Sequence, residues 1–381
     1  MRPVLVLILH AEAPADAGPL VRALADARRD LAEKQRNAFL VAGADRVEIV
    51  AGPPDGLSFG ERLVAEWRRL GSASAAPFPA SPPAPAPAGL IVLGSGSIPL
   101  ATAADLGRFV EVAAGPGGHA IANNRYSADV VAISRAADLA GLPPLPADNA
   151  LPRWLEERAG VMVADLRSRW RLGVDIDTPV DLIVMGGATV LSGESPANAV
   201  ADRLTALSGV LSNRRAELLV AGRVSAATLS WLQRGVACRV RALVEERGLK
   251  AASRLAQGEG GGITAGSTLP RPPHSILGDL LDHDGPESLA AAVAQLADAA
   301  VIDTRVLMAH RYGAAESGWP AAEDRFASDL LRPDDIADPW LTTLTLSAAS
   351  TSADHPIILG GHTLVNGGLR LLAQRARAGN R

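Results

Sequence analysis

The sequence predicts an α/β protein with two domains, on the strength of three observations. Short, continuous apolar runs such as residues 4–9 (VLVLIL) and 89–93 (GLIVL) are typical of strands that a sheet buries on both faces. These runs alternate with helical segments along the chain, as they do in α/β folds. A length of 381 residues is enough for two domains with a substantial core, and we place them at residues 1–192 and 193–381.

In the first half, apolar runs predict strands at residues 4–9, 46–50, 89–93, 120–122 and 129–133. Helices are predicted at residues 18–42, 58–67, 103–113 and 151–158, with a short helical layer near 165–169. Thr102 is expected to cap the helix that follows it. Residues 73–88 are rich in Pro, Ala and Ser, a composition that favours a flexible loop or a semi-rigid spacer.

In the second half, strands are predicted at residues 217–221, 238–244, 300–307 and 356–359. Helices are predicted at residues 196–213, 225–233, 286–299 and 339–349, and a final helix follows the glycine-rich stretch 360–368. The glycine-rich run 257–266 favours a flexible segment. This alternation predicts a second, smaller α/β domain of the Rossmann-like, doubly wound type.

Composition excludes several classes of protein. A formal net charge of −4, with only two lysines (Lys34 and Lys250), gives no basic patch for nucleic acid or for a membrane surface. The single cysteine, Cys238, excludes an intrachain disulfide and a zinc site made of several cysteines. The apolar start is too short for a signal peptide, and no run is long enough to span a membrane. We therefore expect a cytoplasmic protein, and apolar helices at the domain junction would suit a homodimer.

The segment 173–182 (GVDIDTPVDL) carries the most chemical information. It predicts a strand, an acidic turn and a helix start, with Thr178 as the N-cap and Asp181 completing an acidic capping box. Asp175 and Asp177 are then expected between a strand end and a helix N-terminus, where they could hold a metal–phosphate ligand. The alternative is that both are only strand-end and helix-cap residues.

This segment resembles the DIDTPEDL signature of the nucleotidyltransferase-like domain. Molybdenum-cofactor guanylyltransferases, phospholactate guanylyltransferases and the related glycosyltransferase-A type fold share that domain. Residues 89–102 (GLIVLGSGSIPLAT) look like the central strand of the family and its D-x-P-L-L-T turn. Residues 59–63 (FGERL) resemble a helix start of related transferases, and residues 146–149 (PADN) a turn that borders an acceptor pocket.

The resemblance covers residues 1–190 and implies a three-layer domain of the glycosyltransferase-A type. It implies Asp175 and Asp177 as ligands of Mg²⁺ or Mn²⁺, and a nucleotide or sugar phosphate as the small-molecule ligand. Two elements depart from the family pattern. Ser97 stands where the family has its metal-binding Asp, and residues 10–18 (HAEAPADAG) replace a glycine-rich, basic phosphate loop.

Other polar residues are candidates for substrate binding because they fall where open α/β sheets place ligands. Arg167, Arg169 and Arg171 alternate, and on a strand they would share one face and could clamp a phosphate; the alternative is a solvated arginine edge. The turn at residues 123–125, together with Asp129, is the second candidate region, with a structural role as the alternative for the turn. The candidate set comprises Ser97, Asn123, Asn124, Arg125, Asp148, Arg169 and Arg171.

The second half offers Asp303, His310 and His362 as candidates for a separate site. Asp303 lies in an apolar strand and could bind a ribose or a metal, or could be a satisfied structural residue. His362 lies in the stretch 360–368, which is either an anion-binding turn or a tightly packed one. The pair His283–Asp284 is similar to the ligand pairs of metal-dependent phosphohydrolases, or is simply a polar loop.

Three functional hypotheses follow. The first is a transferase that moves a nucleotidyl group from a nucleoside triphosphate to a small phosphorylated acceptor with the help of a divalent metal. The second is a non-catalytic binding or regulatory protein that kept the fold, which Ser97 and the altered first loop favour. The third is an enzyme whose site lies in the second half, around Asp303, His310 and His362.

Overall fold

The computed structural model describes residues 2–53, 55–72, 89–186, 196–245 and 274–379. The segments predicted as flexible at 73–88 and 257–266 therefore lie outside the described residues. The chain divides into two compact units, of which the first comprises residues 1–17 and 22–176 and the second residues 18–21 and 177–381. This division falls at residue 176, whereas the sequence places the boundary at 192, so the helix that follows Thr178 belongs to the second unit.

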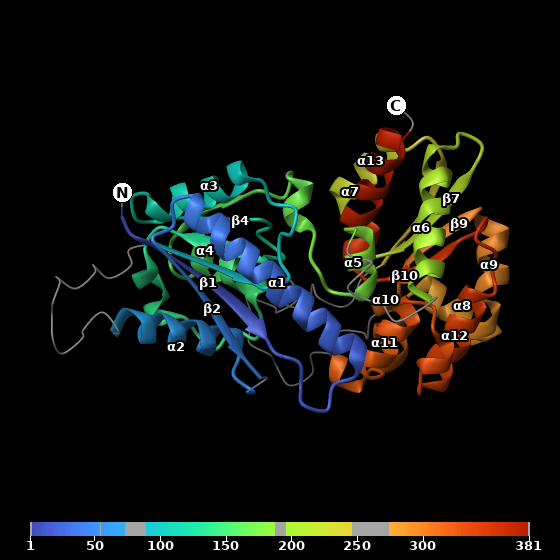
Figure 1. Cartoon of the computed structure of the whole chain (residues 1–381), viewed down its shortest axis with the longest axis horizontal. Helices are drawn as coiled ribbons and strands as arrows, with labels where there is room; N and C mark the ends of the chain where they lie inside the picture. Colours follow the sequence, from blue (N-terminus) through green and yellow to red (C-terminus); the bar gives the residue numbers. More distant parts are fainter. Residues whose placement is uncertain (1, 54, 73–88, 187–195, 246–273, 380–381) are drawn as a thin grey trace, which may run out of the picture. The chain divides into compact units, whose positions relative to one another are not determined.

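The first unit contains a six-stranded mixed sheet in the order β2-β1-β3-β5-β4-β6. Figure 1 labels β1, β2 and β4 of this sheet. Its strands are β1 (Val4–Ala11), β2 (Arg46–Gly52), β3 (Gly89–Gly94), β4 (His119–Ala122), β5 (Val130–Ile133) and β6 (Met162–Asp165). Strand β5 is antiparallel to both of its neighbours, and the other pairs are parallel. The five strands predicted for this half are all present.

Helices cover both faces of this sheet because the buried strands present apolar side chains on both sides. Val4, Val6 and Ile8 of β1 pack in one cluster with residues of α1 (Pro19–Val41) and α3 (Ala103–Ala114). Leu5 and Leu7 face the opposite way. They pack with residues of α2 (Phe59–Ser72) and α4 (Leu151–Glu157).

Two predicted helix starts are confirmed as capping boxes. Thr102 caps α3 by accepting from the Asp105 N–H, while the Asp105 carboxylate accepts from the Thr102 N–H. Thr178 and Asp181 make the same reciprocal pair at the start of α5 (Pro179–Val184). These bonds satisfy backbone donors that a helix N-terminus would otherwise leave unpaired.

The pKa values of the two capping carboxyls, Asp181 and Asp105, are shifted in opposite directions. Burial raises the pKa of Asp181 to about 7, and the charge of Asp177 adds to the rise. A carboxyl with a raised folded-state pKa stabilises the fold at low pH, and this contribution is lost as the pH rises from about 4 to about 7. In Asp181→Asn, the free energy of unfolding should therefore fall less steeply than in wild type as the pH rises over that interval. The two slopes should differ by up to ~1.4 kcal/mol per pH unit.

Urea unfolding between pH 4 and 8 measures this effect, with Asp105→Asn as the matched control. Burial acts to raise the pKa of Asp105, but hydrogen bonds from Thr102 and the charge of Arg169 outweigh it, so that pKa lies below its usual value. The control Asp105→Asn should therefore lower the free energy of unfolding at neutral pH. Parallel pH profiles for wild type and Asp181→Asn would contradict the prediction.

The second unit contains a four-stranded parallel sheet in the order β10-β9-β7-β8. Its strands are β7 (Glu217–Gly222), β8 (Arg239–Val244), β9 (Ala299–Asp303) and β10 (Ile357–Gly360). Its longer helices are α6 (Pro196–Ser212), α7 (Ala226–Gly235), α8 (Ile276–Asp284), α9 (Leu289–Leu296), α10 (Thr304–Tyr312), α11 (Ala322–Asp329), α12 (Pro339–Ala349) and α13 (Leu369–Gly379). Because β7 lies between β8 and β9, the strand order reverses next to β7, and open parallel sheets bind ligands at such a point.

Three predictions for the second unit need correction. The apolar run 300–307 is not one strand, because β9 ends at Asp303 and the buried residues that follow it begin α10. An apolar run alone does not separate a buried strand from a buried helix. The helix expected at 286–299 is shorter, since α9 ends at Leu296 and β9 begins at Ala299. The final helix does not wait until the end of the glycine-rich stretch 360–368, because helical structure begins within that stretch and a π-helical turn, Leu364–Gly368, leads directly into α13.

Two predictions for the end of the first unit are also wrong. The region expected to be helical near 165–169 follows β6, and a short 3₁₀ helix, Trp170–Gly173, comes after it. The motif strand is reduced to an isolated antiparallel bridge between Asp175 and Ser97.

Candidate functional site

The two motif positions that the sequence singles out in the first unit lie side by side. Ser97 follows β3 and pairs with Asp175 in an antiparallel bridge, and the Ile176 N–H donates to the Gly96 carbonyl at 2.9 Å. A Cβ on Gly96 would lie 2.9 Å from the Ile176 carbonyl oxygen, so glycine permits this close approach. Both Ser97 and Asp175 are buried.

The backbone beside Ser97 is strained. Ile98 has a φ of 46°, and a positive φ is a genuine outlier for a β-branched residue. The Ile98 side chain is fully buried, and the Ser97 carbonyl oxygen accepts from Gln35 Nε2 at 2.5 Å, which helps to hold the turn. Strain of this kind persists only where the surrounding structure fixes it, and it occurs often at functional sites.

Two arginines of α1 reach the same edge of the sheet, and the sequence patterns did not indicate them. Arg28 Nε donates to the Ile176 carbonyl at 2.6 Å, beside the Ser97–Asp175 bridge. Arg29 Nη2 forms an ion pair with Glu12 at 3.1 Å, and its Nε lies 3.5 Å from His10 Nε2. These side chains bring positive charge to an edge where the loop at residues 10–18 has none.

His10 at the end of β1 is a buried imidazole whose surroundings disfavour its charged form. Burial lowers the pKa of His10, and the charge of Arg29 lowers it further. Its Nδ1 lies 3.0 Å from Ser95 Oγ. Because arginine only donates, His10 Nε2 accepts and the ring proton belongs on Nδ1, facing Ser95. His10 and Ser95 could have been found by noting which polar residues end or follow the strands that precede the motif, whereas Arg28 and Arg29 lie inside α1, where no pattern singles them out.

Most of the other candidates in the first unit have structural partners. Asn123 donates to Asp129 Oδ2 at 2.6 Å and to the Leu172 carbonyl at 2.7 Å, while its Oδ1 accepts from the Asp129 N–H at 2.9 Å. The Asn123 amide therefore closes its own turn and joins that turn to the 3₁₀ helix at Leu172. The other candidates accept locally or pair with nearby acids: Asn124 accepts from the Tyr126 N–H, Arg125 pairs with Glu156, and Asp148 accepts from the Asn149 N–H.

The alternating arginines do not form a clamp. Arg169 pairs with Asp105 at 2.6 Å, and Arg167 lies 3.4 Å from Asp165. The guanidinium of Arg171 stacks 5.3 Å from the centre of the Trp170 ring. The prediction of one shared face required a strand, and a turn with a 3₁₀ helix stands there instead.

An open hollow of about 520 Å³ lies in the first unit beside α4. Its lining residues are Asp138, Gly141, Pro143, Trp154, Arg158 and Ala159. Asp148 of the predicted acceptor turn is not among them, so the hollow does not support the role expected for that residue.

In the second unit, charged residues gather at the carboxyl ends of the strands, where the strand order reverses. Arg223, which follows β7, holds Asp303 at the end of β9 with contacts of 2.6 and 3.2 Å. Burial acts to raise the pKa of Asp303, but the charge of Arg223 outweighs it and lowers that pKa overall. A Cβ on Gly222 would lie 2.3 Å from the Asp303 Cβ, so glycine permits β7 and β9 to meet here.

Asp177 and His362 lie at the same edge of this sheet. His362 Nδ1 is 3.8 Å from Asp177 Oδ2, and both side chains are partly exposed. Asp175 belongs to the first unit and Asp177 to the second, so the two acids of the motif are divided between the units. Asn366 adds two hydrogen bonds at this edge, from its side-chain amide to the carbonyls of Arg223 and His362.

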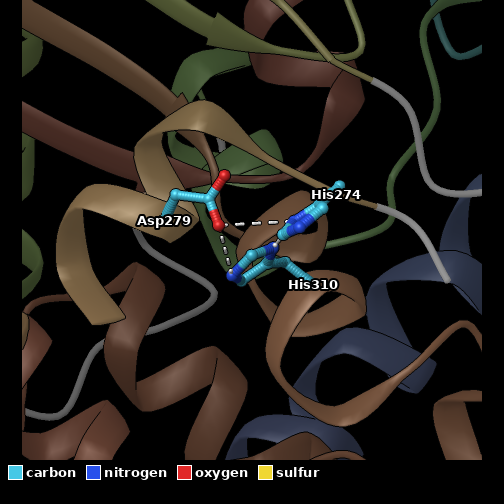
Figure 2. A group of neighbouring side chains, drawn as sticks. All are labelled: His274, Asp279 and His310. Carbon is cyan, nitrogen blue, oxygen red and sulfur yellow. Dashed lines mark hydrogen bonds and ion pairs between the residues drawn. The ribbon is translucent and has the colours of Figure 1, made fainter. Parts of the chain in front are cut away.

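His310, the third candidate of the second half, belongs to a different group. It lies in the last turn of α10 and comes together with His274 and Asp279, as Figure 2 shows. The other histidine–acid pair, His283 and Asp284, is exposed, with 2.6 Å between His283 Nδ1 and Asp284 Oδ1.

No model of a known protein family matches this chain, and no curated protein matches it either. Within the residues that the structure describes, no helix combines the length and the apolar character needed to span a membrane.

Proposed function

We propose that the first unit is a nucleotidyltransferase-like domain of the glycosyltransferase-A type that binds a nucleotide or a sugar phosphate. The observation that carries this proposal is the bridge between Ser97 and Asp175. The resemblance gives both positions a role at one metal–nucleotide site, although 77 residues separate them in the sequence. The strained backbone at Ile98 beside the bridge supports a functional role for this edge.

The residues at this edge suit a phosphorylated ligand. Arg28 and Arg29 supply guanidinium groups, which bind phosphate oxygens through paired N–H donors. Asp175 supplies a carboxylate, and Mg²⁺ in proteins is often held by one or two carboxylates together with substrate phosphates. Mg²⁺ or Mn²⁺ therefore fits here as a metal that arrives with the nucleotide, because Ser97 contributes a hydroxyl and no charge.

The proposed reaction is nucleotidyl transfer to a small phosphorylated acceptor. An acceptor oxygen attacks the α-phosphorus, the bond from that phosphorus to the bridging oxygen breaks, and pyrophosphate leaves. Arg28 and Arg29 would neutralise the charge that develops on the leaving group, and the rigid edge would align the reactants. A metal, when bound with the nucleotide, supplies further charge neutralisation.

The test is a thermal-shift panel on the full-length protein. ATP, GTP, CTP and UTP are each added with and without Mn²⁺, because a ligand that binds the native state raises its melting temperature in proportion to log concentration. One nucleotide should give a metal-dependent shift that Asp175→Asn abolishes and that Asp165→Asn, a matched change at the end of β6, retains. Equal shifts for wild type and Asp175→Asn would contradict the proposal.

The panel also separates the alternatives. If wild type shows the metal-dependent shift but releases no pyrophosphate, the same edge has a binding or regulatory role. A second candidate function, an active site in the second unit, is favoured by the pair of partly exposed Arg223 and buried Asp303 at the point where strand order reverses. That function predicts a shift that survives Asp175→Asn and is lost in Arg223→Gln.

A further inference from the structure

Two histidines and one aspartate of the second unit point toward one another (Figure 2). His274 precedes α8, Asp279 lies in the first turn of α8, and His310 lies in the last turn of α10. The two Nδ1 atoms are 3.0 Å apart, and Asp279 Oδ1 is 3.4 Å from His274 Nδ1. One ligand atom from each residue lies within 4.8 Å of the other two.

His310 Nδ1 has two close polar partners, whereas one imidazole lone pair accepts one hydrogen bond well. His310 Nε2 lies 3.1 Å from Asp282 Oδ2, and because a carboxylate only accepts, the ring proton belongs on Nε2. Nδ1 then carries a single lone pair, which meets both the Ser275 N–H at 3.2 Å and His274 Nδ1 at 3.0 Å. A cation between the two Nδ1 atoms would use the lone pairs of both rings.

The surroundings hold the His310 ring in this orientation. Its side chain is only 7 % exposed, and the contact of its Nε2 with Asp282 is the carboxylate–histidine arrangement that orients metal-binding imidazoles. The ring also packs directly on the backbone of α8 at Gly278. A Cβ at that position would lie 2.6 Å from His310 Cδ2, so glycine leaves the space that the ring occupies.

We propose that His274, Asp279 and His310 form a binding site for a divalent transition-metal ion of the zinc class. Two imidazole nitrogens and one carboxylate oxygen suit Zn²⁺ or Co²⁺, whereas Mg²⁺ prefers ligand sets made of oxygen. The side chains of His274 and Asp279 are mostly exposed, so the ion can enter from solvent and keep a fourth position open for water or a ligand. This site is separate from the proposed nucleotide site of the first unit.

The test is to titrate the full-length protein with Co²⁺ alone and monitor the visible absorption of the bound ion. A separate titration with Zn²⁺ alone is measured by calorimetry. Wild type should bind with 1:1 stoichiometry at this site and show the strong absorption of a four- or five-coordinate Co²⁺ centre. His274→Ala and Asp279→Asn should each weaken binding at least tenfold. Asp282→Asn should weaken it about 10- to 100-fold through the orientation of His310.

Two further variants keep the result specific. His283→Ala removes an exposed histidine of α8 that also faces an aspartate, and it should bind the metal as wild type does. Gly278→Ala should displace the His310 ring and weaken binding without removing a ligand. Equal affinity in wild type and His274→Ala, or equal losses in His274→Ala and His283→Ala, would overturn the proposal. Asp175→Asn should leave metal binding at the His274–Asp279–His310 site intact. Failure of the metal-site proposal can therefore be distinguished from failure of the proposed nucleotide site.

Discussion

Arg305→Leu should lower the unfolding free energy of the second unit by about 3–5 kcal/mol. Arg305 of α10 and Asp329 of α11 form a two-pronged ion pair with contacts of 2.6 and 2.7 Å, and both side chains are almost fully buried. Burial raises the pKa of Asp329 even with Arg305 beside it. Without its partner the carboxylate would be buried and uncompensated, which is the costly way to break such a pair.

The loss should depend on pH with a definite sign. In Arg305→Leu the pKa of Asp329 rises further, so the folded variant favours a protonated carboxyl that stabilises at low pH and ceases to do so as the pH rises. The destabilisation should therefore be smaller near pH 4 than near pH 8. Denaturant unfolding at both pH values measures this difference.

Two controls sharpen the result. The double variant Arg305→Leu, Asp329→Leu removes both charges and should recover much of the lost stability. Arg239→Leu removes one partner of the exposed pair with Glu217, 3.7 Å apart, and should change stability by less than ~1 kcal/mol. A loss in Arg305→Leu as small as that in Arg239→Leu would show that the buried pair is not required.

Ser97→Asp should convert the proposed nucleotide site into one that binds the metal at least tenfold more tightly. The change introduces, directly across the bridge from Asp175, the carboxylate that the proposed nucleotidyltransferase-like assignment expects at this position. Without metal, two neighbouring buried carboxylates repel one another, so the variant should melt below wild type. With Mn²⁺ and a nucleoside triphosphate, its melting temperature should rise by more than that of wild type.

Ser97→Asn is the matched control, because asparagine has the shape of aspartate without its charge. It should reproduce any steric effect of the larger side chain and show no gain with Mn²⁺. If the two variants respond equally to Mn²⁺, the Ser97–Asp175 edge is not a metal site and the proposed function loses its main support.

Much of the fold follows from local patterns in the sequence. Continuous apolar runs located β1, β3 and β7 because a buried strand has no polar face. Thr102 and Thr178 marked helix starts correctly, since a capping box is specified within four residues. Local signals were ambiguous where one buried element follows another without a polar break, as at Asp303, where β9 passes directly into α10.

The candidate sites were predicted only in part, because they depend on contacts between distant segments. The sequence singled out Ser97 and Asp175 individually, but the bridge that joins them depends on how the chain folds back. Arg28 lies within a helix whose pattern gives no reason to single it out, and its role appears only in the contact with Ile176. Asn123 illustrates the reverse error, since the side chain of a polar turn residue near a sheet edge can be engaged by structural hydrogen bonds, here within its own turn and to the Leu172 carbonyl.

The most direct test of the proposed function is a crystal structure of the full chain with Mn²⁺ and a non-hydrolysable nucleoside triphosphate. Anomalous scattering from Mn²⁺ locates the ion without reference to the protein coordinates. We predict a peak within coordination distance of the Asp175 carboxylate, with the phosphates near Arg28 and Arg29. A nucleotide bound elsewhere, with no Mn²⁺ peak at Asp175, would contradict the account.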